Sequence, residues 1–166
     1  VPSASMRFPR GVMAFDAERV AIDALNDIII WDIARNKKKA VLQGHESTIN
    51  QMQFSHDGRM LASVSNDRSL RLWSLDSWKE IHQVVGHAER VMSVAFTPDD
   101  ATIATGDRAG RISLWSTKYG LGLCTLAAWE QPIEELVFSA GGRYLAWRAE
   151  GSTWIADTGA EPKGSD

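Results

Sequence analysis

The sequence has few of the features that suit a metal, a membrane or a nucleic acid. It contains one cysteine, Cys124, so an intrachain disulfide cannot form; this favours a reducing, cytoplasmic location. No apolar run approaches the roughly 20 residues of a membrane-spanning helix, and the N-terminus has no apolar core of a secretory signal. A net charge of −3 gives no reason to expect a nucleic acid as partner.

Signatures of catalysis and of cofactor binding are also scarce. The chain has no GxSxG elbow and no Gly-rich phosphate loop. None of its four histidines pairs with a cysteine or histidine at the spacing of a zinc site. We therefore expect no catalytic residue, no metal ligand and no cofactor.

An internal repeat is the strongest positive signal. Residues 43–73 recur 42 residues later as residues 85–115, with a Gly-His pair, a phenylalanine and a tryptophan in register (Gly44-His45, Phe54 and Trp73; Gly86-His87, Phe96 and Trp115). A fixed period of this size marks a repeat architecture.

The same frame continues more weakly on both sides. Phe138 and Trp154 extend it towards the C-terminus, with Trp129 at the place of the histidine, and Phe15 with Trp31 extends it towards the N-terminus. The chain therefore divides into a lead-in (residues 1–10), four units (about 11–43, 44–85, 86–127 and 128–158) and a disordered tail (159–166).

Each unit contains short β-runs bounded by turn residues, and no convincing helix is present. Ile28 to Ile30 form a continuous apolar run that suits a strand packed on both faces. The basic run Lys37 to Lys39 is expected to be a solvated turn between strands. Cys124, in a predicted strand without a cationic neighbour, is expected to be a buried, inert thiol. The fourth unit stops after its third strand.

These repeats resemble the WD-repeat (WD40) family. The resemblance covers nearly all of residues 10–158 and is carried by the Gly-His pairs and by the runs IIIWDI (28–33), LASVSNDRSLRLW (61–73) and ATGDRAGRISLW (104–115). It implies an all-β fold of four propeller blades, each a four-stranded antiparallel sheet, the last without its own outer strand. It also implies a protein-binding platform that is not an enzyme.

One set of residues admits two interpretations. His45, Ser63 and Asp67 have the side chains of a hydrolase triad, but with Trp73 they match the structural tetrad of the family. The tryptophan N–H can donate to the serine, the serine to the histidine, and the histidine to the aspartate. We favour the structural interpretation. The third unit has His87, Thr105 and Trp115 of the tetrad, but Ala109 stands where the aspartate would be.

The candidate partner-binding face lies at the loops before the first strand and after the second strand of each unit, where partners of the family usually dock. Trp129 there is either a hot-spot anchor or a packed residue between blades. For most of the charged members taken singly, an ordinary solvated loop is the favoured interpretation, and the face as a whole is a stronger candidate than any one member. The candidates are Glu46, Thr48, Asn66, Arg68, Glu89, Arg90, Arg108, Trp129, Glu130 and Arg148.

Four blades would leave an apolar face open at each end of the array. We therefore expect a scaffold that completes its ring as a homodimer or with the rest of a longer chain, to whose C-terminal part these residues would correspond. The alternative is an auxiliary propeller domain of a larger bacterial multidomain enzyme, such as a signalling kinase or protease. An active hydrolase on these blades is the third and weakest possibility.

Overall fold

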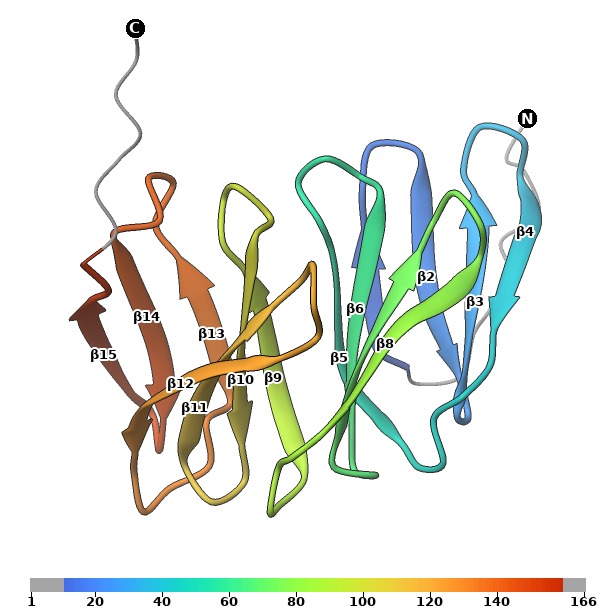
Figure 1. Ribbon diagram of the computed structural model, residues 1–166. Coiled ribbons are helices and arrows are strands. Elements are labelled where there is room, and N and C mark those ends of the chain that lie inside the picture. The colour runs from blue at the N-terminus through green and yellow to red at the C-terminus, as the bar shows by residue number, and fades with distance from the viewer. Residues whose placement is uncertain (1–10, 160–166) are drawn as a thin grey trace, which may run out of the picture.

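The computed structural model describes residues 11–159, and this part of the chain consists of strands and turns alone. The fifteen strands form four antiparallel sheets, each with its strands in chain order. No helix among the described residues is long and apolar enough to cross a membrane. The sheets follow one another in chain order across the molecule, like the blades of a propeller (Figure 1).

We number the sheets as blades 1 to 4. Blade 1 contains β1 (Met13–Phe15), β2 (Arg19–Ala24), β3 (Asp27–Asp32) and β4 (Lys37–Leu42); blade 2 contains β5 (Ile49–Phe54), β6 (Met60–Ser65), β7 (Ser69–Ser74) and β8 (Lys79–Val85). Blade 3 contains β9 (Val91–Phe96), β10 (Thr102–Asp107), β11 (Arg111–Ser116) and β12 (Gly122–Ala128); blade 4 contains β13 (Glu135–Phe138), β14 (Tyr144–Ala149) and β15 (Ser152–Asp157). The prediction of four blades with a three-stranded last blade is confirmed.

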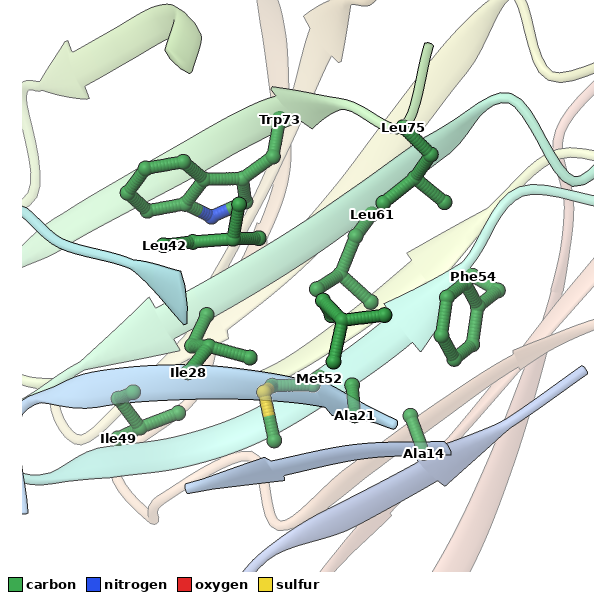
Figure 2. Packing of buried hydrophobic residues seen from close by; sticks show 11 residues of the cluster. Ala14, Ala21, Ile28, Leu42, Ile49, Met52, Phe54, Leu61, Trp73 and Leu75 are labelled. Atoms are coloured by element: carbon green, nitrogen blue, oxygen red, sulfur yellow. The ribbon is translucent and has the colours of Figure 1, made fainter. Parts of the chain in front are cut away.

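The apolar cores lie between neighbouring blades. Ala21 and Ile28 of blade 1 pack against Met52, Phe54 and Leu61 of blade 2, as Figure 2 shows. Equivalent clusters fill the gaps between blades 2 and 3 and between blades 3 and 4. Each fully buried Ile, Leu or Phe side chain contributes about 1.5–3 kcal/mol, so the contacts between blades stabilise the array.

The first strands of successive blades, β1, β5, β9 and β13, lie next to one another. Two glutamines of β5 reach across this row: Gln51 Oε1 accepts a hydrogen bond from the Val94 N–H (2.7 Å), and Gln53 Oε1 accepts one from the Phe96 N–H (2.8 Å). The side chains of blade 2 thus satisfy backbone donors on the outer edge of β9, where no described strand pairs with it.

Two local predictions were wrong. Lys37 to Lys39 lie in the strand β4 and not in a turn, although all three side chains are exposed as expected. Cys124 is exposed and not buried. It pairs with Leu114 on the face of blade 3 that is turned towards blade 4, and blade 4 has no fourth strand among the described residues to cover it.

The predicted lead-in, residues 1–10, lies outside the described residues, as does all of the predicted tail except Gly159. The boundaries assigned to the four units stay predictions. The sheets themselves span residues 13–42, 49–85, 91–128 and 135–157.

Candidate functional site

The loops that carry the predicted tetrad and the predicted partner face meet at one end of the blades. Backbone hydrogen bonds join the loop before the first strand to the turn between the second and third strands. The Asn66 N–H donates to the Thr48 carbonyl (2.9 Å), and the Arg108 N–H donates to the Arg90 carbonyl (2.8 Å). We call this end of the array the loop face.

In blade 2, four polar side chains form a continuous hydrogen-bonded chain under the loop face. Trp73 Nε1 donates to Ser63 Oγ (2.9 Å), Ser63 Oγ lies 2.7 Å from His45 Nε2, and His45 Nδ1 lies 2.7 Å from Asp67 Oδ2. Because the indole can only donate, the serine hydroxyl donates onward to a neutral histidine, whose Nδ1–H faces the carboxylate. This series of hydrogen bonds runs from Trp73 in β7 to Asp67 in the turn between β6 and β7.

The electrostatics of blade 2 agree with this direction. Burial lowers the pKa of His45 and outweighs the opposite effect of Asp67, so the imidazole stays neutral. Burial by itself would raise the pKa of Asp67, but hydrogen bonds from Ser69, His45 and the Glu46 N–H outweigh it and lower that pKa from 3.8 to about 2. A neutral histidine therefore donates to an ionised aspartate.

The same geometry opposes a hydrolase at this site. Ser63 is fully buried, and its oxygen already accepts a hydrogen bond from Trp73. The His45 side chain is also inaccessible to solvent. A nucleophile needs an open approach and a separate set of oxyanion donors, and the packed indole leaves no room for a substrate at this serine.

Blade 3 repeats the chain with a different acid. Trp115 Nε1 donates to Thr105 Oγ1 (2.7 Å), which lies 3.0 Å from His87 Nε2. Sequence alignment placed Ala109 at the position of the acid, but the structure brings Asp107, two residues earlier, to 3.6 Å from His87 Nδ1. Asp107 is fully buried at the end of β10, and its Oδ1 accepts a hydrogen bond from the Arg111 N–H (2.9 Å).

Blade 4 has no polar chain at this place. Repeat spacing aligns Trp129 with the histidines and Trp147 with Ser63, while Trp154 takes the role of the third-strand tryptophan. The three indoles pack together, with ring centroids 5.7 Å apart for Trp129 and Trp147 and 4.5 Å apart for Trp129 and Trp154. Within the described residues, the buried N–H groups of Trp129 and Trp147 have no hydrogen-bond acceptor. Trp129 is therefore a half-buried residue packed between blades that still reaches the loop face.

The remaining candidates of the partner face spread over the same end of the molecule. Arg68 adopts a left-handed backbone (φ 68°), and its Nη1 donates to the Ala88 carbonyl of the next loop (3.5 Å). Arg148 pairs with Glu134 and Glu135, so its charge is partly neutralised. Among the ten candidates, Asn66 and Trp129 are half-buried and the others, Glu46, Thr48, Arg68, Glu89, Arg90, Arg108, Glu130 and Arg148, are exposed.

The other histidines serve as local contacts. His56 Nδ1 lies 2.8 Å from Asp100 Oδ1, which joins blades 2 and 3 at the end opposite the loop face. His82 Nε2 lies 3.2 Å from the Lys118 carbonyl. Within residues 11–159 no group of three or more His, Cys, Asp or Glu side chains could hold a metal ion.

The fold and the buried tetrads define a repeat protein built from propeller blades. The WD domain, G-beta repeat family matches residues 36–74 and 78–116. Each match runs from the outer strand of one blade through the third strand of the next. The chain belongs to the WD-repeat family, whose members bind protein partners and are mainly noncatalytic scaffolds.

Curated relatives agree with this assignment. The chain is 31% identical to apoptotic protease-activating factor 1 of Homo sapiens, over 71% of this chain and 11% of the relative. It is 32% identical to periodic tryptophan protein 2 of Arabidopsis thaliana, over 74% of this chain and 13% of the relative. It is also 32% identical to eukaryotic translation initiation factor 3 subunit I of Coccidioides immitis, over 63% of this chain and 31% of the relative. The chain thus spans between a tenth and a third of these relatives.

Proposed function

We propose that this chain is a noncatalytic protein-interaction scaffold that completes a larger ring of blades and presents the loop face to a protein partner. The proposal depends most on the two ends of the array, because each leaves apolar side chains without a neighbouring blade. Met13 and Phe15 of blade 1 are 55% and 64% exposed, and Val137 and Ile155 of blade 4 are 56% and 70% exposed. Exposed apolar faces of this kind mark interfaces.

A second copy of this chain could complete the ring without any other protein. Val137 and Ile155 lie on the same face of blade 4, since both residues flank Ala146 in the strand register. The edge of β15 lies beside them, and no strand among residues 11–159 pairs with it. Two copies joined end to end would cover these faces and make a ring of eight blades.

Light scattering coupled to size exclusion tests this form directly. We expect a particle of twice the 18.3 kDa chain mass. A Val137→Glu/Ile155→Glu variant should run as a monomer, because two carboxylates cannot be buried in an apolar interface. Leu121→Glu is the matched control, because Leu121 is equally exposed (64%) but lies in the turn between β11 and β12. A monodisperse wild-type monomer would rule out the homodimer.

The loop face is the proposed docking surface for a protein partner in the cytoplasm, a compartment where disulfides are rare and which suits a chain with a single cysteine. Substituting Arg68 and Arg108 together should weaken partner capture by the full-length protein, since arginine is enriched at interface cores. The β circular dichroism signal should not change, because both side chains are exposed. Unaltered capture would place the docking surface elsewhere.

A second candidate is an auxiliary propeller domain within a larger multidomain enzyme, such as a bacterial signalling kinase or protease. Its support is that the chain covers only 11% and 13% of two of its relatives, so related repeats occur inside much longer proteins. The complete open reading frame decides between a scaffold and such a domain: a catalytic domain in the same frame would favour the second candidate.

A further inference from the structure

A cavity of about 360 Å³ opens on the loop face of blade 4, next to the packed indoles. Trp129 and Trp154 form its apolar wall, and Trp154 is 43% exposed. Glu130 and Glu150 line the same cavity, and none of its lining residues is cationic. The site thus combines aromatic rings with two exposed carboxylates.

The cavity exists because the turn between the second and third strands is shorter in blade 4. In blade 2, this turn carries Asp67, which covers His45. In blade 4 only Glu150 and Gly151 connect β14 to β15, both with left-handed backbones (φ 50° and 73°), as in a two-residue hairpin turn. Among the described residues, no side chain takes the place of Asp67, so the edge of the Trp129–Trp154 pair borders the cavity.

We propose that this cavity binds an arginine side chain of a partner polypeptide. A guanidinium group stacks on an indole face, where the negative ring potential attracts the cation. Its planar fork of five N–H donors can serve both Glu130 and Glu150, which the compact ammonium group of lysine does less well. This proposal gives a chemical identity to part of the proposed docking surface, and it rests on that surface being used.

The contrast with blade 2 supports the assignment. Glu46 follows His45 as Glu130 follows Trp129, but its N–H donates to Asp67 (3.0 Å) and the histidine beside it is buried. Blade 2 thus has a carboxylate at the same position without an accessible aromatic wall. Glu46→Gln is therefore a matched control for Glu130→Gln.

The test is a titration of the isotopically labelled chain with a short arginine peptide, acetyl-Gly-Arg-Gly-amide, followed by NMR. Each of the seven tryptophans gives one indole N–H signal, and substitution to phenylalanine assigns each signal. We expect the signals of Trp129 and Trp154 to move and those of Trp73 and Trp115 to stay. The same peptide with citrulline, which is neutral and nearly the same shape, should bind about three- to thirtyfold more weakly.

Variants refine the test. Glu130→Gln and Glu150→Gln should each weaken arginine binding severalfold, while Glu46→Gln leaves it unchanged. Trp154→Phe keeps an aromatic ring and should retain part of the affinity; an unchanged Trp73 signal shows that the blades stay folded. Equal binding of arginine and citrulline peptides, or no movement of the Trp129 and Trp154 signals, would overturn the proposal. Tighter binding of the same peptide with lysine in place of arginine would also contradict it.

This titration tests the proposed arginine site separately from the proposed homodimer. It needs neither a partner protein nor a completed ring, so a negative result with an intact dimer rejects the arginine site alone. A positive titration with a monomeric chain would leave the cavity as a binding site and reject the homodimer.

Discussion

In blade 2, His45, Ser63 and Trp73 occupy the positions that Trp129, Trp147 and Trp154 occupy in blade 4. Blade 2 closes its end with directional hydrogen bonds, all of 2.9 Å or less. Blade 4 closes the same end by packing indoles, and two of their N–H groups find no acceptor among the described residues. A polar chain fixes one geometry, whereas packed rings allow a gap beside them. This difference supports the proposal that blade 2 holds one geometry and that blade 4 carries a binding surface.

The third-strand tryptophans give the largest expected contrast. Trp73→Ala should destabilise the chain by about 3–5 kcal/mol, because Trp73 is 2% exposed and anchors the hydrogen-bonded chain. Trp154→Ala should cost about 1–2 kcal/mol, because 43% of Trp154 is already exposed. Urea unfolding followed by circular dichroism measures both. Equal losses would mean that the two blades depend on their tryptophans in the same way.

The turns before the third strands give the next contrast. Gly110 has a left-handed backbone (φ 80°), and an added Cβ would collide with the carbonyl group of Trp129. Gly110→Ala should therefore cost about 3 kcal/mol. Gly151→Ala, with a similar φ of 73° and no atom near the added Cβ, should cost about 1 kcal/mol. Thermal unfolding compares the two variants, and a larger loss for Gly151→Ala would contradict the packing described at Trp129.

The two acids of the tetrads should differ less. Asp67 accepts hydrogen bonds from His45, from Ser69 and from the Glu46 N–H, so Asp67→Asn should cost about 2 kcal/mol. Asp107 lies 3.6 Å from His87, and its Oδ2 has no hydrogen-bond partner among the described residues. Asp107→Asn should cost about 1 kcal/mol or less. Chemical unfolding of both variants against wild type tests whether the acid of blade 3 is the weaker one.

Near neutral pH, the pH dependence of stability should reflect the buried histidines of blades 2 and 3. Burial lowers the pKa of His45 and of His87 from 6.5, so below pH 6.5 the unfolded chain binds protons that the folded chain does not. The stability that these two imidazoles contribute is therefore present well above pH 6.5 and is lost progressively as the pH falls through 6.5. A further loss should occur between pH 3.8 and about 2, as Asp67 becomes protonated.

A control for this pH dependence is His56→Gln, since His56 is exposed at the opposite end of the blades. This variant should keep the loss of stability below pH 6.5. His87→Gln should remove part of that loss, because one of the two buried imidazoles is gone. If His56→Gln abolished the loss of stability and His87→Gln left it intact, the loss would not come from the buried histidines of blades 2 and 3.

Sequence spacing was sufficient to predict the four sheets, because one tryptophan and one phenylalanine recur in every unit and mark equivalent strands. It was also sufficient to propose that His45, Ser63, Asp67 and Trp73 act together, and these four side chains do lie in contact. A period of 42 residues assigns equivalent positions well wherever the turns have equal length.

The spacing did not predict contacts that side chains make across a turn, or exposure that depends on whether a neighbouring strand is present. Asp107 reaches His87 from the end of a strand, whereas alignment considered only the turn position of Ala109. The structure buries Trp147, and the spacing did not show that it would join Trp129 and Trp154 in one cluster. The exposure of Cys124 follows from a strand that blade 4 lacks, which local sequence around the cysteine does not reveal.

Gln51 and Gln53 have a consequence for how any larger ring would assemble. Both amides reach from β5 to the backbone of β9, so the opening angle between blades 2 and 3 is set at the inner row of strands. In a closed ring, the angles between neighbouring blades must add up to a full turn, so an error in each angle adds to the next. In any larger ring, the amide side chains of Gln51 and Gln53 would therefore help to hold the angle between blades 2 and 3.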